Sequence, residues 1–499
     1  MGHQQTQHPS LPKLHPIIVR IATSSVGCPK TSLALTMVIM RLALLLPLAY
    51  AADDHIKPAE FLTKWGTDTL PEDATISTPA LAEAWMKRGL KARDAGALEA
   101  AVRAQWRGAF HAPFFAHSWR HLGNALLRSA AYDLSCEYAV EARHALSLAY
   151  FHLRDAHAGK GLQALDSISE LGDCYGDDLE LDKAEGAALR ALAALDADRG
   201  QASSAADAVS AYCDDLQGVR VEGASTFSPR IARRFYAALR ICGVVSLGEL
   251  VDEDTLHAVA TLETEVRSAF EAGQGGKGLA AAALSDPRVR GRGQNRFEVE
   301  LPALALNASV VAHPVLHPLI GLALGTAGVE LDAISSVVAY PGAALQDHHA
   351  DTSEIVDVLR RQGELPQLPA HGAIAIVPLV PLDPKKNGGT QFELGSHISR
   401  LRDTELRTRP AIANSGDAYI YDLRTRHGGL PHAGSAPRPL LSLPYVKDWY
   451  VDAVNHPTRH TEAFDAVNDT TLKKLLVRVD ARRHHEDLFA ARGGVCDNV

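Results

Sequence analysis

The sequence predicts an α+β protein of several domains, in which a domain of α-helices precedes a small barrel of two β-sheets. At 499 residues the chain is too long for one ordinary domain. Residues 79–216 are rich in Ala and Leu, and their apolar positions recur with the 3.6-residue period of helices. Residues 225–456 instead contain short β-type segments separated by Gly, Pro and Asn turns, which is typical of an antiparallel sandwich or barrel.

Composition and charge exclude two kinds of partner. Hydrophobic residues make up 46% of the chain and charged residues 22%, as in globular proteins. The formal net charge of −9 offers no positive footprint for nucleic acid. No long polybasic run indicates binding to a membrane surface. We therefore expect a globular protein with no nucleic-acid partner.

The first 52 residues are expected to be a targeting leader, because they contain no Asp or Glu. The stretch MVIMRLALLLPLAYA holds an apolar block too short to span a bilayer and ends in Ala-Tyr-Ala, which is typical of a signal-peptide cleavage site. We expect cleavage near Ala51, a linker at residues 53–78, and a secretory or secreted protein with no stable transmembrane span when mature. An organelle transit peptide, for a mitochondrion or plastid, and a signal anchor at residues 33–48 are the alternatives.

The six cysteines form no Cys-x-x-Cys pair, which excludes a structural zinc cluster. The leader holds one of them, Cys28, and the other five are spread along the chain. Two disulfides with one free thiol would fit a secreted protein, whereas the absence of disulfides would fit the interior of an organelle. The sequence leaves both possibilities open. Cys242 lies in an apolar run and is expected to be a core residue of a strand.

The helical half, residues 79–216, contains a repeat. Trp85 and Trp119 are 34 residues apart, and so are Gly89 and Gly123. The stretch WRHLGNALL matches the opening of a tetratricopeptide repeat. We predict a tetratricopeptide-like repeat domain whose concave face suits a peptide or a protein partner. The alternative is an Ala-rich helical bundle in which the Trp spacing is a coincidence.

The second half begins with a helix, a short apolar strand and a second helix, between residues 232 and 270, with residues 252–255 as the capping region of the second helix. Six further segments have the length and residue types of strands, at residues 296–303, 334–340, 372–382, 390–394, 418–424 and 440–446. We expect a small double-sheet barrel with helices packed outside it. Residues 457–499 include a charged run and are predicted to be a helical tail, with His484 and His485 on its solvated surface.

A metal site is predicted from the stretch LQDHHADTSE and a later histidine. His349 and Asp351 follow a strand at the barrel mouth and, at spacing i and i+2, can bind one metal together. His427 is expected at the end of a later strand, where it would supply a second imidazole. Two imidazoles and one carboxylate leave metal positions open, which is the arrangement of non-haem Fe(II) oxygenases. Arg438, eleven residues after His427, can bind a carboxylate through two parallel hydrogen bonds.

Other histidines are expected to have different roles. His348 has no acid two residues later and is predicted to lie beside the site or on the surface. His432 as the third ligand would leave Arg438 only six residues away, too close for the predicted strand crossing. His397 is expected to follow a turn and to have a capping or hydrogen-bonding role.

The ordered set resembles the phytanoyl-CoA dioxygenase family of iron- and 2-oxoglutarate-dependent oxygenases. The resemblance covers about residues 227–456 and rests on the motifs GVVSLGEL, YPGAALQDHHAD, NGGTQFELGSH, GDAYIYDLRTRHGGL and PYVKDWYVD. It implies that the barrel is a distorted double-stranded β-helix, the jelly-roll or cupin-like fold. The chain departs from the family at Gly428 and Gly429, where members carry bulkier or hydroxylated residues, and at His432, where they often carry Asn.

The resemblance also implies which residues bind the cofactors. It assigns the Fe(II) ligands to His349, Asp351 and His427. It assigns contacts with the cosubstrate 2-oxoglutarate to Arg438, Gln346 and Thr390. O₂ is the oxidant that such a site consumes.

The function expected from these residues is hydroxylation of a small organic or lipid-derived molecule, with release of succinate and CO₂. The second possibility is a peptide or protein hydroxylase that uses the helical repeats as a substrate dock. The third is a binding protein without catalysis, in which the barrel only supports the helical half. The complete set of ligand residues disfavours this third reading.

Overall fold

The computed structural model describes residues 79–133, 136–168, 171, 174, 176–197, 200–215, 220–221, 227–273, 278–286, 288–302, 308–352, 369–411, 413–450 and 475. All of them belong to one compact unit, Asp68–Val499. The predicted leader and linker lie outside the described residues, and so does the predicted tail, apart from Leu475. In the described part of the chain, no helix is both long and apolar enough to cross a membrane.

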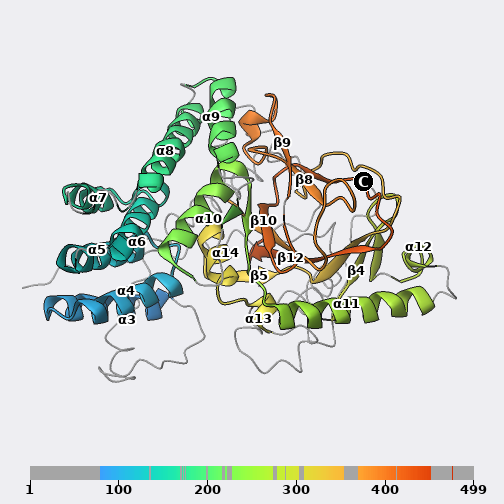
Figure 1. Cartoon of the computed structure of the whole chain (residues 1–499), viewed down its shortest axis with the longest axis horizontal. Coiled ribbons are helices and arrows are strands. Elements are labelled where there is room, and N and C mark those ends of the chain that lie inside the picture. Colours follow the sequence, from blue (N-terminus) through green and yellow to red (C-terminus); the bar gives the residue numbers. More distant parts are fainter. Residues whose placement is uncertain are drawn as a thin grey trace, which may run out of the picture. The chain divides into compact units, whose positions relative to one another are not determined.

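Helices fill the first half, which confirms the helical prediction (Figure 1). Neighbours along the chain pack together, α3 on α4, α4 on α5 and α5 on α6. Each helix buries one apolar side against the next, and a single cluster of buried side chains continues from this half into the β-sheet half. The helices are α3 Pro79–Asp94, α4 Leu98–His111, α5 Ala116–Asp133, α6 Cys136–Ser147, the π-helix η2 Leu148–His152, α7 Ala158–Asp166, α8 Gly176–Asp196 and α9 Ala202–Asp215.

Small residues set the spacing of the helix pairs. A Cβ atom at Gly89 of α3 would lie 2.5 Å from Nε2 of Gln105 of α4. A Cβ atom at Gly123 of α5 would lie 2.6 Å from Cγ of Leu146 of α6. In both pairs the first helix approaches the second where it carries glycine, because no side chain separates them.

Helix α10, Pro229–Cys242, leads into the β-sheet half and has clear start and stop signals. Ser228 accepts a hydrogen bond from the amide of Ile231, Pro229 occupies the first turn, and Gly243 ends the helix at φ 83°. The strand β2, Val244–Leu247, and helix α11, Glu253–Gly273, follow, so the predicted helix–strand–helix order is confirmed. The predicted cap of α11 is present, since Asp252 accepts from the amide of Thr255 at 2.8 Å.

The prediction that Cys242 lies in a strand is wrong. The left-handed conformation of Gly243 lets α10 continue through Cys242 before the strand starts. Cys242 forms a disulfide with Cys213 of α9, and Cys136 forms one with Cys174. Of the two possibilities that the sequence left open, the one with two disulfides is therefore found.

The β-sheet half contains a larger and a smaller sheet, and all six predicted strands are present. The larger has the order β1-β2-β10-β7-β12-β6-β4-β3, with β5 beside β12, and the smaller has the order β11-β8-β9. All pairs are antiparallel except β1 with β2. The strands are β1 Arg220–Val221, β2, β3 Val289–Gly291, β4 Arg296–Glu300, β5 Val329–Leu331, β6 Ser335–Ala339, β7 Gly372–Pro378, β8 Thr390–Glu393, β9 Thr408–Pro410, β10 Ala418–Asp422, β11 His427–Gly429 and β12 Arg438–Lys447.

Strand register decides which residues share a face of the larger sheet. Ala339 of β6 lies opposite Arg296 of β4 on one side and Arg438 of β12 on the other. Residues directly opposite one another point to the same face, so the two arginines do as well. The next residues on that face are the row Glu298, Val337 and Leu440. On the other face Ser336 contacts Glu263 of α11, which covers the sheet from outside.

A buried ion network joins the helical half to α10. Arg233 of α10 is fully buried and pairs with Asp182 and Glu185 of α8. Glu185 also contacts Nε2 of His152 at 2.9 Å. Arg143 of α6 pairs with Asp182 as well. Because each charge has an opposite partner in a dry interior, the network fixes how these helices meet.

Candidate metal centre

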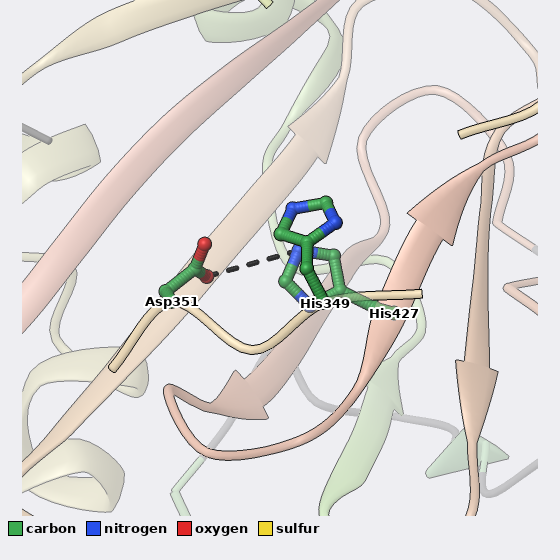
Figure 2. A group of neighbouring side chains, drawn as sticks. All are labelled: His349, Asp351 and His427. Atoms are coloured by element: carbon green, nitrogen blue, oxygen red, sulfur yellow. Dashed lines mark ion pairs between the residues drawn. The ribbon is translucent and has the colours of Figure 1, made fainter. Parts of the chain in front are cut away.

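Three of the residues singled out in the sequence meet in space. His349, Asp351 and His427 each offer a ligand atom, and these atoms all lie within 4.8 Å of one another (Figure 2). Nε2 of His427 lies 3.7 Å from Oδ2 of Asp351, and the two imidazole rings have their centroids 4.6 Å apart. Two nitrogen donors and one carboxylate oxygen so close together form a group that could hold a metal ion.

Backbone hydrogen bonds bring the two ligand segments together. The amide of His349 donates to the carbonyl of His427 at 2.9 Å, and the amide of His427 donates back at 2.8 Å. The amide of Gln346 donates to the carbonyl of Gly429, and that of Asp351 to the carbonyl of Leu423. His349 forms an isolated bridge rather than part of a regular strand. The segment before Asp351 thus runs along β11 and places both of its ligands beside His427.

Both histidines are oriented by their other ring nitrogen. Nδ1 of His427 lies 3.0 Å from the carbonyl oxygen of Thr425, and Nδ1 of His349 lies 2.9 Å from that of Asp347. A carbonyl only accepts, so each Nδ1 carries the proton and each Nε2 keeps its lone pair. Such outer hydrogen bonds orient metal-binding imidazoles. Nε2 is therefore the metal-facing atom of both rings.

The glycine pair after His427 permits the close approach of the two segments. A Cβ atom at Gly428 would lie 2.8 Å from the carbonyl oxygen of Gln346. At Gly429 it would lie 2.3 Å from Nη1 of Arg296 and 2.6 Å from Oε1 of Gln346. These distances leave no room for a side chain. The presence of glycine at both positions therefore has a structural cause in this chain.

Arg296 links the two ligand segments through hydrogen bonds. Its Nη2 donates to the carbonyl of Ala344 at 2.9 Å and to that of Leu430, so it bonds one residue from each segment. Its side chain is 2% exposed. Burial and the nearby Arg438 lower the pKa of Arg296 to about 10. The guanidinium still carries its charge at neutral pH and holds the loops around the centre.

Aromatic rings enclose His427. The ring of Tyr421 lies 4.7 Å from it and that of Phe392 lies 5.9 Å away. The Tyr421 hydroxyl donates to Oδ2 of Asp351 at 3.3 Å, and burial, followed by the charge of Asp351, holds the pKa of Tyr421 well above its usual range. Burial lowers the pKa of His427, with Asp351 acting in the opposite direction. A neutral imidazole and a charged carboxylate are the forms that bind metal.

A pocket that is partly open to solvent surrounds the three residues. His349 is exposed while His427 is buried, so the pocket opens on the His349 side. Besides the three ligand residues, the pocket is lined by Arg292, Glu298, Val337, Gln346, Ile374, Ile376, Thr390, Tyr421, Gly429, Leu440 and Ser442.

Arg438 lies on the pocket face of β12. It precedes Leu440 and Ser442, which line the pocket, by two and four residues, and alternate residues of a strand share a face. Its side chain is 1% exposed, and within the described part of the chain its Nε and Nη1 atoms have no hydrogen-bond partner. Burial lowers its pKa, while nearby Tyr419 raises it. A buried guanidinium without an anion is costly, so this site fits a carboxylate ligand.

The other two residues assigned to the cosubstrate also line the pocket. Thr390 contacts the hydroxyl of Tyr419 at 3.0 Å, next to Arg438. Gln346 uses its side-chain amide within the protein, donating to the carbonyl of Arg292 at 2.7 Å and accepting from the amide of Gly429 at 2.9 Å. Thr390 thus lies near Arg438, whereas Gln346 supports the segments that carry the ligand residues.

The remaining histidines lie outside the ligand group. His348 faces Glu393, with Nδ1 3.5 Å from the carboxylate. His432 is buried and donates from Nε2 to the carbonyl of Ala436. His397 is buried and donates from Nε2 to the carbonyl of Arg240 at 2.9 Å, as a hydrogen-bonding role requires.

Sequence reasoning missed Tyr421 and Arg296. Tyr421 alternates with Tyr419 along β10, so the period-2 pattern of AYIYD was a usable signal for a shared, buried face. Arg296 had no such signal, because its partners Ala344 and Leu430 offer only backbone carbonyls. Backbone acceptors are the same in every residue type and leave no trace in the sequence.

No protein-family model matches the chain. Among solved structures, it is similar to the non-heme α-ketoglutarate-dependent epimerase SnoN from nogalamycin biosynthesis, at 17% identity over 44% of this chain and 83% of that one, with a TM-score of 0.33. It is similar to the α-ketoglutarate-dependent carbocyclase SnoK at 17% identity over 46% and 89%, with a TM-score of 0.34. It is also similar to EctD from S. alaskensis, solved with 2-oxoglutarate and 5-hydroxyectoine, at 16% identity over 43% of this chain and 75% of that one, with a TM-score of 0.32. At such low scores the chemistry of this chain has to be inferred from its own site.

Proposed function

We propose that the protein is an Fe(II)- and 2-oxoglutarate-dependent dioxygenase of the phytanoyl-CoA dioxygenase type. The observation that carries this proposal is the group of His349, Asp351 and His427, to which the described residues add no fourth ligand. It lies in a pocket whose face also bears the buried Arg438, with Nε and Nη1 unpaired among those residues. Three protein donors leave metal positions for a chelating cosubstrate and O₂. A structural metal site would instead be closed by a fourth protein ligand.

Each residue of the site has a role in this proposal. His349, Asp351 and His427 would hold Fe(II), and Arg438 would bind the distal carboxylate of 2-oxoglutarate beside the Thr390 hydroxyl. Fe(II) and 2-oxoglutarate, when bound, would supply the oxidative decarboxylation by O₂ that yields succinate, CO₂ and a hydroxylated product. Tyr421 would keep Asp351 oriented, and the buried rings around His427 would exclude water from its side of the site.

We propose a small organic or lipid-derived substrate. The wall formed by Val337, Ile374, Ile376 and Leu440 is apolar, and the same pocket contains the polar side chains of Arg292 and Glu298. An apolar wall with a few polar groups is typical of small-molecule sites, in which the polar groups orient the ligand. A substrate with an apolar body and a polar end fits this lining best.

We also propose that α3–α4 and α5–α6 are two tetratricopeptide-like units and that the β-sheet half is a jelly roll. The equivalent placement of Gly89 and Gly123, each against the second helix of its pair, supports the repeat. A secretory or secreted location is part of the proposal. The pairs Cys136–Cys174 and Cys213–Cys242 support it, because disulfides persist in oxidising compartments.

The test is an anaerobic titration of the purified chain with Fe(II) and then 2-oxoglutarate. The chelate of a 2-oxo acid on Fe(II) gives a weak visible charge-transfer band, which we expect in the wild type. His427→Ala should abolish the band, because it removes a ligand. Arg438→Ala should keep the band but raise the 2-oxoglutarate concentration for half-saturation by about 100-fold, in line with a lost charge-assisted bond of about 3 kcal/mol.

His348→Ala is the matched control, because His348 is adjacent to His349 but lies outside the ligand group. It should leave the band and the half-saturation point unchanged. A folded wild type without any band would exclude the proposed function. A band that survives in His427→Ala would show that a different group binds the metal.

A further inference from the structure

The third ligand residue is connected to the end of helix α10. Nδ1 of His427 donates to the carbonyl of Thr425 at 3.0 Å, and the Thr425 hydroxyl donates to the carbonyl of Gly243 at 2.8 Å. Thr425 is fully buried. One residue, Thr425, thus separates the imidazole of His427 from the residue that ends α10.

The same helix end accepts hydrogen bonds from a turn and from the end of β10 in the β-sheet half. The carbonyl of Cys242 accepts from the amide of Gly395 at 2.8 Å, and that of Gly243 also accepts from the amide of Asp422 at 3.0 Å. The last carbonyls of a helix have no partner within it, so they are available to such neighbours. A Cβ atom at Gly243 would lie 2.5 Å from Oγ1 of Thr425 and 2.6 Å from Nδ1 of His397, so both side chains pack directly on this residue.

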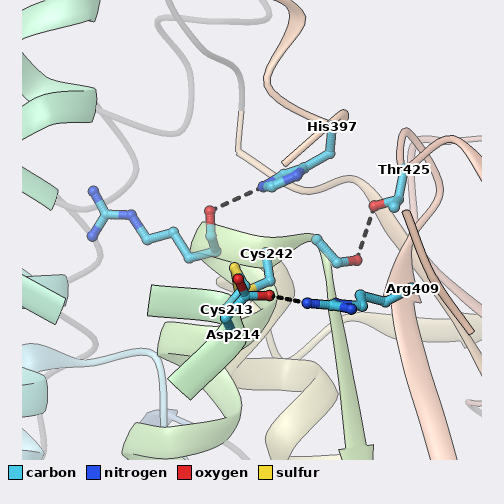
Figure 3. The surroundings of a disulfide bond; sticks show 8 residues. Cys213, Asp214, Cys242, His397, Arg409 and Thr425 are labelled. Carbon is cyan, nitrogen blue, oxygen red and sulfur yellow. Dashed lines mark hydrogen bonds and ion pairs between the residues drawn. A yellow bond between two sulfur atoms is a disulfide. The ribbon is translucent and has the colours of Figure 1, made fainter. Parts of the chain in front are cut away.

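A disulfide holds this helix end in place (Figure 3). Cys242, the last residue of α10, is bonded to Cys213 near the end of α9, and both are buried. The next residue of α9, Asp214, accepts from Arg409 of β9 at 2.7 Å and also pairs with Arg407. Strand β9 pairs with β8, and β8 with β11, which begins at His427. The disulfide therefore joins two helix ends that each contact the segment of His427, one through Thr425 and one through the smaller sheet.

We propose that the Cys213–Cys242 disulfide and Thr425 are positioning residues for His427, and that the helical half sets metal affinity through them. The disulfide fixes the end of α9 against the end of α10. Thr425 bonds both to the end of α10 and to the His427 ring, so the position of α10 orients the ring. Asp214 at the end of α9 binds the smaller sheet through Arg409 of β9. Without the covalent bond, the noncovalent contacts described above would have to keep the ends of α9 and α10 in place by themselves. This inference rests on the proposed metal centre.

The chain contains a matched control for the disulfide. Cys136–Cys174 closes a comparable sequence separation, 38 against 29 residues, but joins the start of α6 to the segment before α8. In the described part of the chain, no hydrogen bond links its cysteines to the ligand segments. Removing it tests the general loss of a cross-link without a direct path to His427.

The experiment uses full-length chain and two measurements. The first is the affinity for Co(II) alone, followed by its visible absorption. The second is hydrogen–deuterium exchange of residues 421–429 in the metal-free chain. For Cys213→Ala/Cys242→Ala and for Thr425→Val we expect about tenfold weaker Co(II) binding, the usual cost of losing an outer-shell contact, and faster exchange of that segment.

Two variants should behave like the wild type in both measurements. Cys136→Ala/Cys174→Ala should lower the melting temperature but leave Co(II) affinity and the exchange of residues 421–429 unchanged. Thr425→Ser keeps the hydroxyl and should restore both values, which keeps the test decisive if the cysteine variants fold poorly.

The outcomes separate the two proposals. A wild type that does not bind Co(II) would contradict the metal centre, and the exchange measurement would then decide whether the helix end positions the segment. Equal Co(II) affinity in the two disulfide variants would overturn the inference even if the wild type binds metal. Unchanged exchange in Thr425→Val would overturn the role of Thr425.

Discussion

Gly429 leaves room for two side chains that support the ligand segments. Its missing side chain leaves the space that the guanidinium of Arg296 and the amide of Gln346 occupy. These two side chains bond to the loops that carry His349 and His427. A residue without a side chain thus permits the contacts that hold the two ligand segments together.

We expect Gly429→Ala to weaken metal binding by at least about tenfold, because the new methyl group would displace supporting contacts of the ligands. The Co(II) titration measures this. Gly291→Ala is the control, since nothing lies within 4 Å of a Cβ atom there. Equal Co(II) affinities for the two variants would contradict this account of Gly429.

The ligand types themselves were readable from the sequence. His349, Asp351 and His427 have side chains that bind Fe(II), and the i, i+2 spacing of the first two limits how they can point. The structure brings these three together and leaves His348 and His432 outside. The role of Arg296 was not readable, because it bonds to carbonyls that every residue possesses.

Helix α10 is the element that joins the two halves of the molecule. Its buried Arg233 pairs with α8, while its last residues accept bonds from the β-sheet half. The start of this helix was predictable from the Ser-Pro sequence, and its end was not placed correctly. The apolar run ICGVVSL is compatible with strand throughout, and only the φ of Gly243 divides it into helix and strand.

We expect Glu185→Ala to destabilise the protein by about 3 kcal/mol, because it leaves His152 and Arg233 buried with one partner fewer. Urea unfolding measures the change. The control is Glu83→Ala in α3, whose pair with Lys87 is exposed on both sides and should cost less than about 0.5 kcal/mol. A similar small loss in both variants would show that the buried network does not hold the helices together.

Three buried or half-buried histidines change the pH dependence of the protein's stability in the same direction. Burial lowers the pKa of His111, His121 and His397 to about 4 from 6.5, with neighbouring arginines acting in the same sense. Between these values the unfolded chain binds more protons than the folded one. Protons therefore favour unfolding, so the free energy of unfolding falls as the pH is lowered from 6.5 toward 4.

We expect the free energy of unfolding in urea to be lower at pH 5 than at pH 7. His121→Gln removes one of these groups and should reduce the slope in this range by up to about 1.4 kcal/mol per pH unit. Stability that rises on acidification would contradict this assignment.

The sequence by itself determined the two kinds of structure in the chain and the chemistry of the candidate site. The helical period, the alternating strands and the ligand side chains are local properties, and each is visible within a few neighbouring residues. Only the tertiary structure decided the rest. The pairing of residues 343–351 with β11, the choice of Cys213 as the partner of Cys242, and the contact of Thr425 with Gly243 all join segments far apart in the sequence. They depend on backbone groups and on close approach, which no single residue type encodes.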